Sequence, residues 1–479
     1  MKRLSEQTSP LARPTRTGIV HLGLGAFHRA HQAVYTEDAM LATDDRSWGI
    51  CGVTQRSDEV LRRLAPQDNL YTLLESGPHA RPPRRIGAVR EVLAAHRDPA
   101  AVVAAIARAD VRIVTLTVTE KGYRHDPATG QLDLTDPEVA ADLAGRPPRT
   151  VVGQLVAGLA ARSAPLTVVC CDNLPGNGPF LRDLVYRFAD AAGRADVVNR
   201  IESTVRFPAT MVDRIVPATT EADRAQVLEA TGLRDEAVVV AEPFSQWVMQ
   251  DDFAAGRPAW ELAGVQFAAD VQSWERLKLR VLNASHSLLA YLGLLAGHEL
   301  IADAVADPLL AAACRGLIDE DVRPVLAVPS GVDITEYGRS VLERFANRAL
   351  RHTTLQVASD GSQKLAPRLL STAIDCLAAG RRPRWVPLVV AAWLRHVVAP
   401  EDAAGRPTRL ADPLADVLRA AGPDPLRLLD TASVFPRELA EDSRFRADVR
   451  NAFVGLAERG PHAVLQELIE LKETRDADD

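Results

Sequence analysis

The sequence predicts an α/β protein, with a Rossmann-like, doubly wound parallel sheet in an N-terminal domain and a mostly α-helical C-terminal domain. Three observations predict this fold. Short apolar runs alternate with helical patterns between Thr17 and about Phe267, which is typical of βαβ units. The first run ends in a glycine turn of the kind that binds dinucleotides. After residue 272 the pattern changes to long segments rich in leucine and alanine.

Five apolar runs are the expected strands of the parallel sheet. They are GIVHLGLG from residue 18, WGICGV at 48–53, VRIVTLTV at 111–118, LTVVCC at 166–171 and AVVVAE at 237–242. The runs are apolar almost throughout, as strands covered on both faces should be. Helices are predicted between them at PAAVVAAIARA, TVVGQLVAGLAARS and GPFLRDLVYRFADAAG, because apolar residues recur there at helical spacing.

The second half of the chain predicts a helical domain. Segments such as SWERLKLRVLNASHSLLAYLGLLAG and WVPLVVAAWLRHVV are separated by glycine and proline. A length of 479 residues is consistent with two or three domains. We therefore expect a Rossmann-type dinucleotide-binding domain at residues 1–272 and a mostly helical domain at residues 273–479, to which the lysine array described below assigns substrate binding and catalysis.

Composition excludes several classes of protein. The 56 Lys and Arg against 63 Asp and Glu give a net charge of -7, whereas a nucleic-acid binder needs a basic excess. The five cysteines form no CxxC pair, which indicates reduced thiols in a cytoplasmic protein. The first residues lack the apolar stretch of a signal peptide and no 18-residue window is free of polar side chains, so we expect a soluble protein that is not secreted. We expect small-molecule partners, neither nucleic acid nor a membrane, and a monomer or small homo-oligomer.

The glycine turn after the first strand is the predicted cofactor site. Gly23 makes the tight turn, and Gly25 lets a pyrophosphate approach the backbone at the N-terminus of the helix that follows. Ala26, Phe27 and His28 complete this predicted cofactor-binding turn, which leads into the helical pattern RAHQAVYTEDAML. His28 stands in place of a third glycine, so the helix must stand further off or use the imidazole. A glycine turn is also common without a cofactor. The neighbouring side chains of His28, Arg29 and His31 either face phosphate or form a solvated helix face.

The residues after the second strand leave the cofactor open between NAD and NADP. An acidic residue there would bind the ribose hydroxyl of NAD, but Thr54, Gln55 and Arg56 follow WGICGV. Arg56 is equally suited to a 2′-phosphate.

Polar residues follow two of the expected strands directly, at residues 119–123 and 172–178. Ligands of open parallel sheets bind at the carboxyl ends of the strands. Asn173 is suited to donate its amide to a carbonyl or alkoxide oxygen, or else it starts a turn or caps the next helix. Glu120 is either a proton relay to solvent or a plain surface carboxylate.

The strongest single signal is an array of Lys278, Asn283 and His286 in an otherwise apolar helical segment. In an α-helix, Asn283 lies about 140° and His286 about 80° round the axis from Lys278, so the three share one broad side. Burial disfavours the ammonium form and lowers the pKa of a lysine toward neutrality, which produces a proton acceptor for an alcohol. The alternative is a lysine that extends to solvent beside Arg276 and Arg280.

Six motifs occur in order along the chain: GLGAFHRAH at 23–31, TEKGY at 119–123, CDN at 171–173, FPATMVDRIVP at 207–217, the Lys278 array and DGSQK at 360–364. Together they resemble the mannitol dehydrogenase family of long-chain polyol dehydrogenases, which includes fructuronate reductase (mannonate oxidoreductase). The resemblance spans residues 18 to about 460. It implies zinc-independent hydride transfer between a nicotinamide cofactor, NAD in these relatives, and a secondary alcohol of an open-chain sugar derivative.

The resemblance also implies roles for individual residues. Lys278 matches the general base, Asn173 and Asn283 the holders of the oxyanion, and His286 a residue that grips a substrate hydroxyl. Glu120 matches a proton-relay carboxylate. No metal ligands are implied.

Further residues match positions near the nicotinamide and the substrate. Val212 and Asp213 match residues beside both, and Lys364 matches a residue on the substrate side. Gln356 stands where some mannitol-oxidising members place an arginine, and the stretch RHTTLQVASDGSQK is more similar to fructuronate reductases.

The leading hypothesis is an NAD(P)-dependent oxidoreductase that interconverts a polyol or aldonic acid with its keto form, either mannitol with fructose or mannonate with fructuronate. A carboxylated substrate would need a further cation, for which Arg206, Arg348, Arg351 and Lys364 are candidates. A metal-dependent dehydrogenase would need clustered ligands, whereas the eleven histidines are scattered. A catalytically silent NAD-binding sensor is the non-enzyme alternative.

Overall fold

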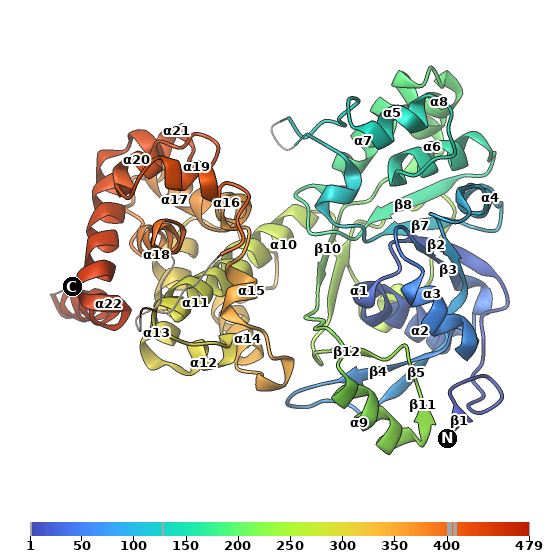
Figure 1. The fold of residues 1–479 in the computed structure, drawn as a ribbon, viewed down its shortest axis with the longest axis horizontal. Coiled ribbons are helices and arrows are strands. Elements are labelled where there is room, and N and C mark those ends of the chain that lie inside the picture. Colours follow the sequence, from blue (N-terminus) through green and yellow to red (C-terminus); the bar gives the residue numbers. More distant parts are fainter. Residues whose placement is uncertain (1, 127–128, 400–404, 406–409, 479) are drawn as a thin grey trace. The chain divides into compact units, whose positions relative to one another are not determined.

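The computed structural model describes residues 2–126, 129–399, 405 and 410–478, with side chains to residue 470. The chain forms two compact units, Met1–Gln272 and Ser273–Asp479 (Figure 1). Within the first unit lie the short helices and strands that surround one large sheet, and the second unit is helical.

The largest sheet of the first unit has six parallel strands in the order β6-β3-β2-β7-β8-β9. The chain starts in the middle at β2 and winds outward in both directions, which confirms the expected doubly wound sheet. The strands are β2 (Thr17–Leu22), β3 (Gly49–Thr54), β6 (Val89–Ala94), β7 (Ile113–Leu116), β8 (Leu166–Cys170) and β9 (Val205–Arg206).

Helices cover both faces of this sheet. Successive residues of β2 point to opposite faces, so Ile19 packs in one hydrophobic core and Val20 in another. The core of Ile19 includes residues of α2, and the core of Val20 includes residues of α4, α6 and α7. The α-helices that lie wholly in this unit are α1 (Ala26–Ala30), α2 (Gln32–Thr43), α3 (Glu59–Leu64), α4 (Pro99–Ala107), α5 (Pro137–Leu143), α6 (Val151–Ala160), α7 (Asn177–Ala191), α8 (Ala195–Ser203) and α9 (Glu221–Thr231).

One of the five expected strands is not part of the main sheet. The run AVVVAE forms β12 (Val239–Ala241), which pairs with β4 (Tyr71–Glu75) in a separate sheet that also holds β5 (Arg84–Ile86). An apolar run predicts a buried strand, but it does not predict which other strand pairs with it. The remaining strands are β1 (Lys2–Arg3), β10 (Thr210–Asp213), β11 (Leu233–Arg234), β13 (Gln246–Met249) and β14 (Gln266–Phe267).

The second unit is built of helices around a single large core. Its central helices, α11 (Ala284–Leu295) and α18 (Val386–Val398), are buried over almost their whole length. The others are α10 (Val271–Leu277, which begins at the boundary), α12 (Ile301–Ala306), α13 (Pro308–Gly316), α14 (Ile334–Phe345), α15 (Thr354–Ala358), α16 (Gly361–Leu365), α17 (Ser371–Ala378), α19 (Ala415–Ala420), α20 (Pro425–Leu429), α21 (Arg437–Glu441) and α22 (Ser443–Asp478). Among the described residues, π-helical segments are η5 (Lys278–Asn283) and η8 (Ala366–Leu370), each of which lies between two α-helices, and η6 (Leu317–Val322), which extends α13.

The five cysteines are buried and none forms a disulfide, as expected. Among the helices that the structure describes, none combines the length and the apolar character needed to cross a bilayer.

Candidate active site

The turn after β2 requires glycine at its first position. Gly23 has φ +101°, and a Cβ atom there would lie 2.1 Å from the carbonyl oxygen of Thr117. Its N–H donates to the carbonyl of Val53 at 2.9 Å, which ties the turn to β3. Gly25 differs, because its backbone is extended and a Cβ would meet nothing closer than the oxygen of Gly23 at 3.7 Å. The side of Gly25 is therefore open to a ligand.

His28 is fully buried and stacks on His21 of β2, with ring centroids 3.4 Å apart. Burial lowers the pKa of His21 to about 3 and holds the pKa of His28 far below its usual value, so both rings are neutral. The stacked imidazoles fill the space that a third glycine would leave. The solvated helix face considered for His28, Arg29 and His31 is wrong, since all three are buried. The helix also breaks at His31 (φ −126°, ψ −89°) into α1 and α2.

The two glycines give a matched pair of variants. Gly25→Ala should fold normally, because the protein leaves room for the methyl group, but should weaken NADH binding about tenfold or more by blocking the approach of the pyrophosphate. Gly23→Ala should instead lower the melting temperature, because its Cβ would overlap Thr117. Calorimetric titration and thermal unfolding measure the two effects. Unchanged NADH affinity in Gly25→Ala would show that no dinucleotide lies against this turn.

A cavity of about 440 Å³ opens at the carboxyl ends of β2, β3 and β7. Gly23 and residues 117–119 line it together with Arg56, which is exposed. The neighbouring Gln55 exchanges two amide hydrogen bonds with Gln154 of α6, at 3.1 and 3.0 Å. The cavity thus lies at the point where the strand order reverses, which is the usual dinucleotide position. Arg56 follows β3, where NAD sites typically carry an acid.

Asp172 joins the ends of β7 and β8, a role that the sequence did not reveal. Its carboxylate accepts the N–H groups of Val118 (2.9 Å) and Thr119 (3.1 Å) and the hydroxyl of Tyr123 (2.6 Å). Burial raises the pKa of Asp172, and these donors oppose the shift. Thr119 is held at φ +66°, a strained conformation that persists only where its surroundings enforce it. Glu120 follows and is exposed.

Asn173 lies at the end of β8 and is exposed. The loop after it is fixed by Asn177, whose amide nitrogen donates to the carbonyls of Asp172 (3.1 Å) and Thr210 (2.9 Å). Asn177 also accepts the N–H of Thr210 at 2.9 Å. Asn177 therefore connects the strand end that carries Asn173 to β10, which carries Val212 and Asp213.

Val212 and Asp213 are almost fully buried and pair with Trp247 and Gln246 of β13. The next residue, Arg214, fixes the position of Val212 and Asp213 through the buried contacts described in the next paragraph. These two residues and the glycine turn belong to the same unit, but the residues that line the 440 Å³ cavity do not include them.

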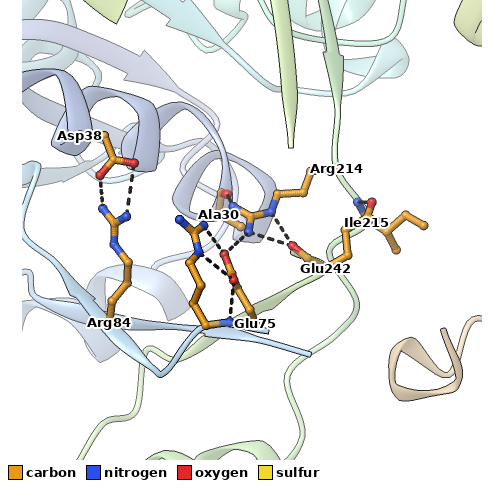
Figure 2. Close-up of polar contacts among 8 residues, drawn as sticks. Ala30, Asp38, Glu75, Arg84, Arg214, Ile215 and Glu242 are labelled. Carbon is orange, nitrogen blue, oxygen red and sulfur yellow. Dashed lines mark hydrogen bonds and ion pairs between the residues drawn. The ribbon is translucent and has the colours of Figure 1, made fainter. Parts of the chain in front are cut away.

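Arg214 forms a buried ion pair with Glu75 of β4 (Figure 2). Its guanidinium also donates to the carbonyls of Ala30 at 2.5 Å and Glu242 at 2.8 Å. The side chains of Arg214 and Glu75 are only 1% and 3% exposed. Burial would raise the pKa of Glu75, but hydrogen bonds and charge from Arg81 and Arg214 outweigh it and lower that pKa. Glu75 therefore stays ionised, and the pair links α1, β4, β10 and the strand end before Glu242.

In the second unit, Lys278 and Asn283 are the first and last residues of the π-helix η5. The N–H of Ala284 bonds to the carbonyl of Leu279, five residues back. The expected 140° between Lys278 and Asn283 assumed an α-helix and is wrong, because a π-helix, with its i→i+5 hydrogen bonds, brings residues five apart closer together round the axis. Lys278 is 6% exposed, so the alternative of a lysine extended to solvent is also wrong. Insertions of this kind often mark functional sites.

His286 begins the next turn and is buried, stacked on Phe345 at 4.5 Å and edge-on to His352 at 4.8 Å. Burial, reinforced by His352 and nearby cations, lowers its pKa far below the usual value, so the ring is neutral. One of those cations is Lys364, which donates to the carbonyl of Ser359 at 2.5 Å. Burial and the charge of Arg368 lower the pKa of Lys364.

Arg368 is a cation that the sequence analysis missed. It lies on η8, which contacts η5, and it donates to the hydroxyl of Ser287 at 3.1 Å, next to His286. Two candidates named from the sequence are engaged elsewhere, since Arg206 pairs with Asp252 and Arg348 pairs with Asp303. The four-residue spacing from Lys364 to Arg368 could have identified Arg368 from the sequence, because residues four apart lie on one face of a helix.

The DGSQK motif has a structural explanation. Asp360 adopts φ +57°, and a Cβ on Gly361 would lie 2.2 Å from the indole nitrogen of Trp393. The close approach positions α16 and with it Lys364. Gln356 is exposed and completes a capping box with Thr353 at the start of α15.

Comparison with known proteins identifies the chain. Residues 17–262 match the family model of the mannitol dehydrogenase Rossmann domain, and residues 270–457 match the mannitol dehydrogenase C-terminal domain. The chain belongs to the mannitol dehydrogenase family. The resemblance inferred from the six motifs is thereby confirmed, and the protein is an oxidoreductase with the two domains of this family.

Three relatives illustrate the range of the family. The D-mannonate oxidoreductase of Escherichia coli is 40% identical, over 96% of this chain and 98% of its own. The mannitol dehydrogenase DSF1 of Saccharomyces cerevisiae is 38% identical, over 98% and 97%. The ternary complex of Pseudomonas fluorescens mannitol 2-dehydrogenase with NAD and D-mannitol is 37% identical and superimposes with a TM-score of 0.87, over 98% of this chain and 100% of its own.

Proposed function

We propose that this chain is an NAD-dependent oxidoreductase that interconverts a secondary alcohol of a polyol with its keto form, as mannitol with fructose. The observation that carries the proposal is the buried Lys278 at the start of a π-helix, followed by Asn283 and His286 on the next turns. The solved relative that binds NAD and D-mannitol supports the cofactor and the substrate class. Five buried thiols suit the reducing cytoplasm, where we place the protein.

The proposed roles follow from the chemistry of each side chain. Lys278 accepts the hydroxyl proton during oxidation, because its burial disfavours the ammonium form. Asn283 donates its amide to the developing alkoxide, and we assign the same role to Asn173. The neutral His286 holds a neighbouring substrate hydroxyl, and the exposed Glu120 passes a proton to solvent.

The nucleotide-binding unit fits a dinucleotide. Gly25 leaves its turn open, and the 440 Å³ cavity lies where the strand order reverses. When bound, a nicotinamide dinucleotide supplies the hydride acceptor for oxidation. We propose that Gly23, Gly25, Ala26, Phe27 and the backbone of His28 border its pyrophosphate. Val212 and Asp213 are proposed to border both the nicotinamide and the substrate.

A sugar acid is the second candidate substrate, and one observation favours it. Lys364 and Arg368 both lie close enough to His286 to shift its pKa. A carboxylate would pair with such cations through charge-assisted hydrogen bonds, whereas a polyol has no charge to offer them. The E. coli relative named D-mannonate oxidoreductase shows that the family includes a sugar-acid enzyme.

Steady-state rates with fructose and fructuronate, each with NADH and NADPH, test the proposal. NADPH belongs in the panel because Arg56 is a cation where an acid would select NAD. We expect turnover of at least one of the two keto sugars with NADH. NADH binding without reduction of any ketose or keto acid would favour the sensor alternative instead.

Arg368→Met removes the charge and keeps much of the side-chain volume. If a sugar acid is the substrate, its KM should rise about tenfold or more, because one charge-assisted contact is lost. The KM for fructose should change much less. An equal effect on the two substrates would show that Arg368 supports the fold around Ser287 and does not recognise a carboxylate.

A further inference from the structure

Three side chains of the second unit converge on one point outside the proposed active-site array. The Oδ2 atom of Asp307 lies 2.6 Å from Nε2 of His462 and 3.3 Å from Nε2 of His298. One ligand atom from each residue lies within 4.8 Å of the others. This cluster is not visible in the sequence, because His298 and His462 are far apart along the chain.

The carboxylate of Asp307 is held in a fixed orientation. Its Oδ1 atom accepts the N–H groups of Leu309 (2.9 Å) and Leu310 (3.4 Å) at the start of α13. Oδ2 is therefore the atom presented to both imidazoles. One oxygen facing two ring nitrogens is an arrangement that a single cation can bridge.

His462 reaches this point because α22 is kinked. Gly460 has φ +77° and ψ 171° inside the helix, a conformation that favours glycine, and Pro461 follows it. The next residue is His462, which is half-exposed. A solvent-open cavity of about 540 Å³ borders all three side chains and gives an ion access to them. Asp303 and Arg348 also line this cavity and form an ion pair with each other at 2.5 Å.

We propose that His298, Asp307 and His462 bind one divalent transition-metal ion, for which Zn²⁺ is the appropriate probe. Two imidazoles and one carboxylate suit Zn²⁺ and similar metals, whereas Ca²⁺ and Mg²⁺ prefer oxygen ligands alone. Tetrahedral zinc would separate its ligand atoms by roughly 3.3 Å. The contact between Asp307 and His462 would open by less than about 1 Å. The two imidazole nitrogens, which lie within 4.8 Å of one another, would move to a similar separation.

The ion would connect α22 to the start of α13 and the segment after α11. Its role is structural, because none of the residues proposed for catalysis contributes a ligand. Zinc-independent hydride transfer is therefore unaffected by the proposal. A ligand that binds only the folded chain also raises its thermal stability.

The test uses the full-length protein after treatment with a chelator. Calorimetric titration should give one Zn²⁺ per chain, and Zn²⁺ should raise the melting temperature by about 3 °C or more. His462→Gln should weaken Zn²⁺ binding by more than about tenfold and abolish the thermal shift. His298→Gln provides a second ligand variant. His79→Gln, which changes an exposed histidine of the other unit, is the control and should behave as wild type.

Two results would overturn the proposal. The first is full Zn²⁺ affinity in both His462→Gln and His298→Gln, which would place any bound zinc elsewhere. The second is the absence of stoichiometric Zn²⁺ binding to the wild-type chain, which would leave the three residues as a hydrogen-bonded cluster. Turnover that survives chelation while the thermal shift is lost would support a structural ion.

Discussion

Lys278→Ala should lower turnover by about 10³-fold while NADH binds almost as in wild type. The lysine is 6% exposed, at the start of the π-helix η5, and it is followed by the buried Val281 and Leu282. A positioned proton acceptor contributes about 10²–10⁴-fold to rate. The effect belongs to proton transfer, so it should appear mainly in kcat and leave cofactor affinity unchanged.

The pH dependence gives a second and independent readout. The proposal makes the neutral amine of Lys278 the base for oxidation, so the oxidation rate should rise with pH. Reduction needs the protonated amine, so the reduction rate should fall as the pH rises. Both dependences should flatten in Lys278→Ala, and small added amines should partly restore its activity. Arg276→Ala, which changes an exposed cation two residues earlier, is the matched control. Near-normal turnover in Lys278→Ala would remove the mechanism.

The sequence predicted the main sheet because parallel strands covered on both faces are apolar throughout. Four of the five expected runs are strands of that sheet. It did not predict β6, because Arg90 and Glu91 interrupt the apolar pattern at the sheet edge. It also misplaced β12, since strand pairing depends on contacts distant in sequence.

The candidate residues were easier to predict than their geometry. The spacing of Lys278, Asn283 and His286 identified the array, but a pattern of 3.6 residues per turn cannot reveal a π-helix. The burial of His28 against His21 could not be predicted from the sequence. It depends on how the helix after β2 packs against that strand. Arg368 and the cluster around Asp307 were missed for a similar reason, since Ser287, His298 and His462 are distant from them or from one another along the chain.

Arg214→Ala should lower the free energy of unfolding of the N-terminal unit by about 3–5 kcal/mol. The substitution removes one partner of an ion pair whose side chains are 1% and 3% exposed, and leaves Glu75 buried. It also removes the donors to the carbonyls of Ala30 and Glu242, which would be left without these bonds. Arg81 would still contact Glu75, but that arginine is 58% exposed and solvent weakens its effect.

Arg81→Ala is therefore the matched control, because it removes the other cation from the same carboxylate. We expect it to cost no more than about 1 kcal/mol. Urea denaturation followed by circular dichroism compares the two variants at equal protein concentration. Since Arg214 adjoins Asp213, which is proposed to border the nicotinamide, Arg214→Ala should also weaken NADH binding under conditions where the chain is still folded. A loss below 1 kcal/mol for Arg214→Ala would mean that this buried pair positions β10 without stabilising it.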